Sequence, residues 1–235
     1  MENTNWRQKI EYTNLKSPSA KELKNFVKTA DNENYYGVCL LYGNLGIARN
    51  IVLNKNLKLI TVAGFPSIWA YDLIKAQPAK YALRGLGMYN QAEIDAIKSI
   101  TDLNEADELD IVFPFYWYVR GYLLRCTHLI AGIKKLYKKP LKVIIELGTL
   151  INGEKNIHEI CSIINDSGAD FVKTNTGLVN RSFDTLIDKL TMLKSFTDKP
   201  IKASGFIRTE KQVKQLIELG VTRIGTSGIK EYEHE

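Results

Sequence analysis

The chain has 235 residues, of which 45% are hydrophobic and 25% are charged, as is usual for a globular protein. It holds 32 lysines and arginines against 26 acidic residues, so its formal net charge is +6. The hydrophobic content argues against disorder, and charges interrupt every long apolar run, which excludes a transmembrane helix.

The first twelve residues, MENTNWRQKIEY, lack the apolar core that a secretory signal needs. Three cysteines without a CxxC pair argue against a disulfide framework. We therefore expect a reduced, cytoplasmic protein. The lysines are scattered, and pairs such as Lys134-Lys135 fall where a helix is expected to end. This distribution favours a solvated surface that attracts an anionic metabolite over a nucleic-acid interface.

Short β-branched or apolar runs alternate along the chain with longer amphipathic stretches. Continuous apolar runs such as Val143-Ile144-Ile145 are typical of parallel strands covered on both faces. The expected strands are a short one near Ile10–Thr13, then Tyr35–Leu41, Leu57–Ala63, Glu108–Phe113, Leu141–Leu147, Asp170–Asn175, Ile201–Ser204 and Arg223–Thr226.

Apolar residues at helical spacing lie between these strands. The expected helices are Ser19–Ala30, Asn90–Ile100, Ile157–Ser167, Phe183–Phe196 and Glu210–Leu219. Eight strands alternating with helices over this length predict an α/β fold, a (β/α)8 TIM barrel. We expect residues 1–235 to form this single domain, with a short amino-terminal lead-in and an acidic tail at Glu231–Glu235. A doubly wound sheet is the alternative fold.

Catalytic residues of such barrels lie at the carboxyl ends of the strands. Lys173 and Lys202 stand inside consecutive expected strands, where lysine is unusual and rarely buried without a partner. If both face one mouth, each disfavours protonation of the other, and a neutral amine is the nucleophile that forms a Schiff base. Asp110 adds an acid on the fourth strand. Alternatively, each lysine is an edge residue that reaches solvent.

Glycine and hydroxyl residues close the last two strands. The run Gly225-Thr226-Ser227-Gly228 ends the eighth strand, and Gly205 follows the seventh. Barrels commonly bind phosphate there through backbone N–H groups, so we expect an anion site. The three histidines lack the spacing of metal ligands, so no metal is expected. Cys39 fits a buried apolar residue better than a nucleophile.

With these residues in view, the chain resembles the deoxyribose-phosphate aldolases, which are class I (Schiff-base) aldolases on a (β/α)8 barrel. The resemblance runs from about Ile10 to Gly228 and rests on several motifs in the right order. The strongest motifs are ADELDIVFP (106–114), LKVIIELGTL (141–150), GADFVKTNTG (168–177), IKASGFIRT (201–209) and RIGTS (223–227).

The resemblance implies a role for each of three residues. Lys173 would form the Schiff base, Lys202 would keep Lys173 neutral and assist proton transfer, and Asp110 would act through an ordered water. The implied reaction is reversible cleavage of 2-deoxy-D-ribose 5-phosphate into acetaldehyde and D-glyceraldehyde 3-phosphate, with no metal or organic cofactor. The expected substrate-binding residues are Cys39, Thr176, Gly177, Ser204, Gly205, Thr226 and Ser227.

The resemblance also implies a small-molecule substrate, either a sugar phosphate or an aldehyde. It implies a homo-oligomer, a dimer or larger, and neither nucleic acid nor a membrane is expected as a partner. One alternative is a barrel that has lost activity and serves as a binding protein, but the joint presence of Asp110, Lys173 and Lys202 argues against it. The other is a basic nucleic-acid-binding protein, for which no motif is present.

Several positions depart from the family pattern, mostly on the phosphate side. Leu178 stands where the family often has a lysine or another polar residue, and Phe206 stands where it usually has a second glycine. Glu11 replaces an aspartate, Ser67–Ala70 lacks the usual Gly-Ala segment, and the turn at Gly228 is one small residue short. We therefore hypothesise that the chain binds phosphate weakly or accepts a different aldehyde.

Overall fold

The computed structural model describes residues 5–52, 56–65, 86–150, 153–179 and 182–229. Within these ranges eight strands form one closed barrel, in which each strand pairs in parallel with the next and β8 pairs with β1. The strands are β1 (Ile10–Asn14), β2 (Gly37–Leu40), β3 (Lys58–Ala63), β4 (Glu108–Val112), β5 (Leu141–Ile144), β6 (Phe171–Lys173), β7 (Ile201–Ser204) and β8 (Arg223–Thr226).

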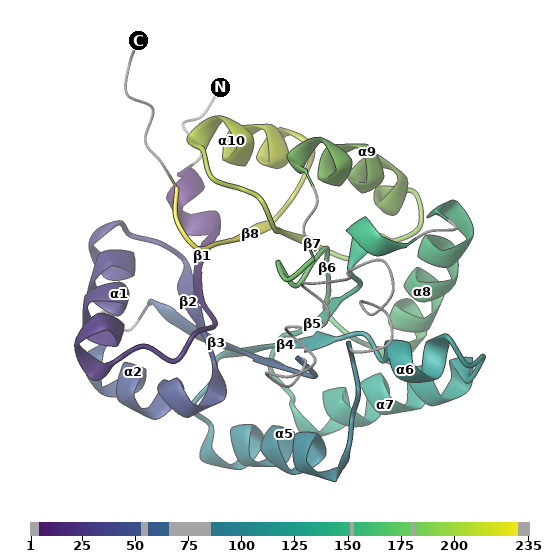
Figure 1. Ribbon diagram of the computed structural model, residues 1–235, viewed down its shortest axis with the longest axis horizontal. Coiled ribbons are helices and arrows are strands. Elements are labelled where there is room, and N and C mark those ends of the chain that lie inside the picture. Colours follow the sequence, from purple (N-terminus) through teal and green to yellow (C-terminus); the bar gives the residue numbers. More distant parts are fainter. Residues whose placement is uncertain (1–4, 53–55, 66–85, 151–152, 180–181, 230–235) are drawn as a thin grey trace.

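Helices surround the barrel, and the two ends of the sheet meet where β1 lies beside β8 (Figure 1). Short 3-10 helices occupy Trp6–Lys9, Tyr42–Asn44 and Leu147–Thr149. The described α-helices are α1 (Ala20–Asn32), α2 (Leu45–Ile51), α5 (Gln91–Leu103), α6 (Phe115–Tyr118), α7 (Leu123–Leu136), α8 (Gly153–Ser167), α9 (Phe183–Lys194) and α10 (Glu210–Glu218).

The closed sheet confirms the predicted (β/α)8 barrel in a single domain and rules out the doubly wound alternative. In the part of the chain that the structure describes, no helix has both the length and the apolar character that a membrane crossing requires. The expected acidic tail and the segment Ser67–Ala70 lie outside the described residues.

Five expected strands, β2 to β6, are shorter than the sequence suggested, and the ends of β5 and β6 have a visible local cause. Apolar character continues beyond Ile144, but β5 ends there and Glu146 takes a left-handed backbone with φ of 46°. β6 ends at Lys173, and beyond it the side chains of Thr174 and Asn175 donate hydrogen bonds to Ser204 O at the end of β7. Helices α2 and α6 were not predicted, since seven and four residues are too few to show a helical period. Helix α7 was also missed, although its expected end near Lys134-Lys135 is correct.

Local capping explains where two of the outer helices begin. The Ser19 side chain accepts a hydrogen bond from the backbone N–H of Glu22, whose carboxylate in turn accepts from the Ser19 N–H. Thr209 and Gln212 form the same reciprocal arrangement at the start of α10. Such capping boxes satisfy N–H groups that the helix itself leaves without partners. The apolar faces of these helices then pack against the barrel.

The strands alternate between two buried environments. Leu109 and Ile111 on β4 belong to the hydrophobic core, whereas Glu108 and Asp110 lie on the opposite face of the strand. All five residues of β4 are buried, so these carboxylates lie inside the protein and not in solvent. The barrel interior therefore holds charge, and its energetic cost must be met by partners within the barrel.

Two aspartates tie neighbouring strands together at the amino-terminal end of the barrel. Asp170 Oδ2 accepts hydrogen bonds from Leu141 N at 2.8 Å and from Lys134 Nζ at 2.6 Å. Asp107 Oδ2 accepts one from Leu59 N at 2.8 Å in the same way. Each aspartate thus completes the hydrogen bonding of the strand before its own.

We predict that Asp170→Ala lowers the free energy of unfolding by about 1–3 kcal/mol, because the buried N–H of Leu141 loses its acceptor. Urea unfolding followed by circular dichroism measures this change. The exposed Asp198 in the next loop provides the control variant Asp198→Ala. Equal midpoints for the two variants would contradict the role given to Asp170.

Candidate active site

A cluster of buried charged side chains fills the interior of the barrel. Each of its residues is at most 4% exposed, and they come from five different strands. The members of this charged cluster are Glu11 (β1), Glu108 and Asp110 (β4), Lys142 (β5), Lys173 (β6) and Lys202 (β7).

Asp110 lies at the centre of the charged cluster. Its Oδ2 is 2.9 Å from Lys173 Nζ and 2.6 Å from Lys202 Nζ, and its Oδ1 is 2.9 Å from Lys142 Nζ. The register explains the meeting, since Lys173 is paired with Lys202 and Asp110 with Lys142 on adjacent strands. The structure thus brings the three expected catalytic residues into direct contact, through a single carboxylate oxygen.

The two glutamates complete the partners of Lys142 and Lys202. Lys142 Nζ lies 2.5 Å from Glu108 Oε2 and 3.5 Å from Glu11 Oε1. The other oxygen of Glu11 contacts Lys202 Nζ. Three amines therefore face three carboxylates, so the buried charges can balance.

The charges in the cluster control one another's ionisation. Burial by itself would raise the pKa of Asp110, but Lys142, Lys173 and Lys202 outweigh it and hold that pKa well below its ordinary value. Burial would lower the pKa of Lys142, yet the surrounding carboxylates raise it well above the ordinary value. Asp110 is accordingly an anion and Lys142 a cation at neutral pH.

One sequence-based expectation about charge is wrong. Neighbouring lysines were expected to favour neutral amines, but the pKa of Lys202 is raised. Burial and the charge of Lys142 lower it, whereas Asp110 and Glu11 raise it by more. The expectation counted the lysines and left out the carboxylates that the closed barrel places between them. Lys202 is therefore an ammonium group.

Sequence reasoning did not include Lys142, Glu108 or Glu11 among the site residues. A usable signal existed for Lys142, because a lysine inside a strand is as unusual there as at Lys173. Glu108 shares its strand face with Asp110, which alternation alone indicates. Glu11 was noted only as a departure from the family pattern, and its contact with Lys202, 191 positions away, could not be read from local sequence.

Cys39 lies on β2 and is fully buried beside Ile60 and Val62. Burial raises the pKa of its thiol, so the sulfur is not a thiolate at neutral pH. Lys202 lowers the pKa of this thiol and Asp110 raises it, each by less than burial does. Cys39 is therefore a small, uncharged side chain buried in the barrel.

The expected substrate-binding residues after β6 and β7 hold two turns together. Ser204 Oγ donates to Asn175 O at 2.5 Å, and Asn175 Nδ2 donates to Ser204 O at 2.9 Å. Thr176 N donates to Glu146 Oε2 at 2.9 Å. Gly177 and Gly205 have φ of 83° and 92°, a conformation that glycine adopts without strain. These residues thus shape the mouth of the barrel beside Lys173.

A cation from the loop after β7, Arg208, reaches the turn after β8, and local sequence did not indicate it. Arg208 Nη1 donates to Thr226 Oγ1 at 3.4 Å, and Gly228 N donates to the same oxygen at 3.2 Å. The expected residue Ser227 is exposed next to this turn. Phe206 has φ of 62°, which is strained for a residue with a side chain. The Arg208 guanidinium therefore borders the expected anion site, and Phe206 occupies the turn after β7 that leads to it.

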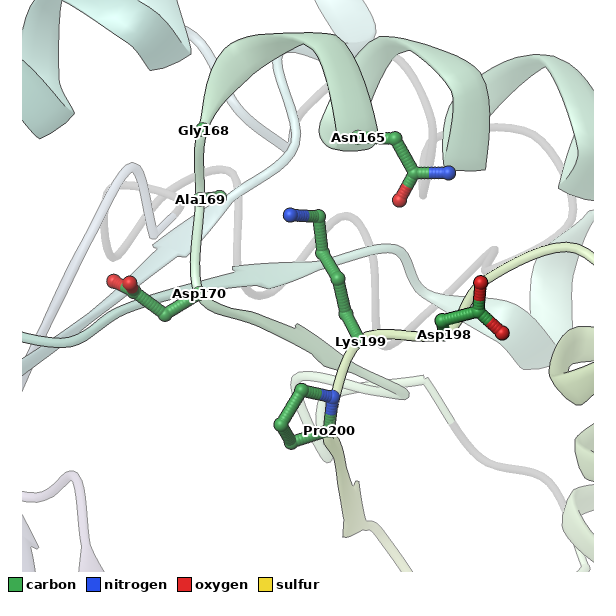
Figure 2. A pocket seen from close by; sticks show the side chains of 7 residues that line it. All are labelled: Asn165, Gly168, Ala169, Asp170, Asp198, Lys199 and Pro200. Atoms are coloured by element: carbon green, nitrogen blue, oxygen red, sulfur yellow. The ribbon is translucent and has the colours of Figure 1, made fainter.

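An open hollow of about 550 Å³ lies at the opposite end of the barrel. Figure 2 shows Lys199 extending from the loop before β7 toward the end of α8. This hollow precedes β6 and β7, so it is separate from the strand ends at which barrel chemistry takes place. Its lining residues are Asn165, Gly168, Ala169, Asp170, Asp198, Lys199 and Pro200.

Comparisons with known sequences reveal relatives along nearly the whole chain. The deoxyribose-phosphate aldolase of Mycoplasmopsis pulmonis is 33% identical over 221 residues, which cover 93% of this chain and 90% of the relative. The deoxyribose-phosphate aldolase of Treponema denticola is 30% identical, with 93% of each chain covered. No protein-family model matches the chain.

Comparisons with solved structures support the same architecture. A structure described as QR15, an aldolase, superposes with a TM-score of 0.79 at 27% identity and covers 97% of this chain and 92% of its own. The tetrameric deoxyribose phosphate aldolase of Aeropyrum pernix gives a TM-score of 0.70 at 22% identity, covering 94% of this chain and 86% of its own. The second likeness supports the barrel fold.

The pKa shifts in the charged cluster predict that the free energy of unfolding falls at both low and high pH. The pKa of Asp110 is lower in the folded chain than its ordinary 3.8, so the unfolded chain binds more protons as the pH falls below about 4, and stability is lost there. The pKa values of Lys142 and Lys202 lie above their ordinary 10.5 in the folded chain, so their contribution is lost as the pH rises beyond it.

The free energy of unfolding, measured with urea from pH 3 to pH 11, checks the expected loss of stability at both ends of the range. In Asp110→Asn, three lysines lose their shared anion, and we expect a loss of about 3–5 kcal/mol at pH 7. The same variant should show a shallower decline below about pH 4, because its side chain no longer titrates. A wild-type free energy of unfolding that stays level through the acid range would contradict the arrangement.

Proposed function

The chain belongs to the deoxyribose-phosphate aldolase family, and we propose that it reversibly cleaves 2-deoxy-D-ribose 5-phosphate into acetaldehyde and D-glyceraldehyde 3-phosphate. It is an aldehyde-lyase by its relatives, and the proposal extends this to a Schiff base on Lys173. The observation that carries it is the Asp110 oxygen shared by Lys173 and Lys202, at 2.9 Å and 2.6 Å.

The first half of the proposed reaction forms the Schiff base. The neutral amine of Lys173 attacks the aldehyde carbon C1 of the open-chain sugar, so a C–N bond forms and the carbonyl oxygen takes up a proton. That oxygen then leaves as water after a second proton transfer, and a cationic iminium remains. The buried carboxylate of Asp110, which contacts Lys173, would stabilise this cation in the barrel interior.

The second half breaks the carbon–carbon bond. Removal of the C3 hydroxyl proton releases D-glyceraldehyde 3-phosphate, and the electron pair of the C2–C3 bond moves into the iminium to give an enamine. A proton delivered to C2 restores an iminium, which water hydrolyses to acetaldehyde and free Lys173. The proposal assigns these proton transfers to Asp110, acting through a water, and to the Lys202 ammonium, because Asp110 Oδ2 contacts both Lys173 and Lys202.

The proposed phosphate site lies at the turns after β7 and β8. Arg208 supplies a cation there, and the backbone N–H groups near Gly205 and Ser227 provide donors of the kind that bind phosphate. We propose roles in substrate binding for Cys39, Thr176, Gly177, Ser204, Gly205, Thr226 and Ser227. This chemistry requires no metal or organic cofactor.

A second candidate is an aldolase of the same mechanism with a weak preference for the phosphorylated sugar. Phe206 favours it, because an aromatic side chain on a left-handed backbone occupies a place that the family pattern gives to glycine. Leu178 favours it as well, since an apolar side chain beside Gly177 offers phosphate no hydrogen bond. This candidate differs from the first only in substrate preference.

We further propose that the chain acts in the cytoplasm as a homo-oligomer, without nucleic acid or a membrane as partner. The surface of α6 and α7 supports assembly, since Val119, Tyr122 and Leu124 are 45%, 49% and 73% exposed. Apolar side chains of this size favour contact with another protein surface. The acidic tail at Glu231–Glu235 is proposed to extend from the single barrel domain.

Borohydride trapping tests the Schiff base directly. Incubation with acetaldehyde and borohydride should reduce the iminium to an ethyl group on Lys173, detected by peptide mass spectrometry. Lys173→Leu should lose both the adduct and more than about a thousandfold in kcat, because no other amine replaces the nucleophile. Lys199→Leu, which removes a lysine at the far end of the barrel, should keep both. An adduct on another lysine, or none in the wild type, would contradict the mechanism.

The phosphate site is tested by comparing kcat/KM for deoxyribose 5-phosphate with that for deoxyribose. Arg208→Gln should lower the first value by about tenfold or more and leave the second unchanged, because it removes a charge-assisted contact. Lys211→Gln, an exposed cation on α10, serves as the control. A wild-type preference for the phosphorylated sugar as strong as that of other family members would exclude the second candidate.

A further inference from the structure

A polar chain extends from the charged cluster toward the amino-terminal end of the barrel. Tyr36 immediately precedes β2, and its hydroxyl donates a hydrogen bond to Glu108 Oε1. The other oxygen of Glu108 lies 2.5 Å from Lys142 Nζ, and Lys142 lies 2.9 Å from Asp110 Oδ1. Asp110 then contacts Lys173. Tyr36 is thus linked to the proposed nucleophile through three charged side chains.

Tyr36 is fixed as a hydrogen-bond donor in this chain. Burial raises the pKa of its hydroxyl, and the hydrogen bond to Glu108 raises it further, so the hydroxyl stays protonated at neutral pH. The guanidinium carbon of Arg223 lies 3.7 Å from the centroid of the Tyr36 ring, which holds the ring in place. The Tyr36 hydroxyl therefore presents its proton to Glu108 and stabilises the carboxylate.

Glu108 changes the charge balance on which a Schiff base depends. In the amine form of Lys173 that the proposed reaction requires, the three carboxylates of Glu11, Glu108 and Asp110 would face only two other amines, those of Lys142 and Lys202, which leaves the cluster one cation short. An iminium on Lys173 restores the balance. Without the charge of Glu108, the same iminium would be an excess cation in the barrel interior, which is costly.

We propose that Tyr36 and Glu108 are positioning residues that keep the charged cluster one cation short and so favour the cationic Schiff base on Lys173. They do this from a distance, because neither contacts Lys173 and their effect passes through Lys142 and Asp110. The inference rests on the proposed Schiff-base function. It adds that Tyr36, at the end of the barrel opposite the proposed substrate site, influences how readily the Schiff base forms.

The test compares Tyr36→Phe, which removes only the hydroxyl, with Glu108→Gln, which keeps the shape and removes the charge. Tyr36→Phe should lower kcat for deoxyribose 5-phosphate about tenfold, because a hydrogen bond to a charged group is lost. KM should change less than about twofold, because substrate does not reach Tyr36. The yield of borohydride-trapped acetaldehyde on Lys173 should fall in parallel, and Glu108→Gln should lower both quantities further.

Tyr137→Phe is the matched control. Its hydroxyl is also buried and donates to a backbone oxygen, Ala106 O, at 3.1 Å. This variant loses a tyrosine hydroxyl of the same kind without breaking the chain to Asp110, so its kcat and its trapping yield should match the wild type. Thermal unfolding of all variants measures the purely structural cost of each change.

The double variant separates positioning from general damage. Because Tyr36 acts through Glu108, adding Tyr36→Phe to Glu108→Gln should lower kcat less than about twofold further. Independent, multiplying losses in the double variant would overturn the inference, and so would a wild-type trapping yield in Tyr36→Phe. A wild type that traps no acetaldehyde on Lys173 would overturn the proposed function and this inference together, whereas normal trapping in all variants overturns only the inference.

Discussion

The structure depends on one carboxylate, Asp110, which is shared by three buried amines. Removing a charge from water costs several kcal/mol unless partners replace the hydration shell. Lys142, Lys173 and Lys202 are each at most 3% exposed, and all three contact Asp110. The barrel interior can hold these amines only because the carboxylates of three strand positions lie among them. The same constraint places Lys173, the proposed nucleophile, among fixed charges.

Two departures from the family pattern, Glu11 and Phe206, have visible structural consequences. Glu11 replaces an aspartate, and its two oxygens contact two different lysines, Lys142 and Lys202, so the change keeps the charge and lengthens the side chain that carries it. Phe206 takes a left-handed backbone that the family pattern assigns to glycine. Glu11 thus keeps the negative charge of the barrel interior, whereas Phe206 changes the shape of the turn after β7.

Much of this could be predicted from local sequence. Alternating apolar runs and amphipathic stretches predict the barrel, and all eight expected strands are present. Lysines inside strands indicate buried charge, which correctly singles out Lys173 and Lys202 as neighbours. The ends of β5 and β6 could not be predicted, because they depend on turns that bond across to other strands. The cation at Arg208 was missed because only the tertiary structure brings it to Thr226.

The sequence by itself determined the periodicity, the succession of strands and helices along the chain, and the identity of the charged residues, because these follow from side-chain chemistry and chain geometry. Only the tertiary structure decided the charge states, because a lysine's ionisation depends on which carboxylates the closed barrel places within contact. Lys202 shows the difference, since its neighbours in sequence indicate nothing about Glu11 and its contact with Glu11 raises its pKa. Closure of β8 onto β1 brings this distant pair together.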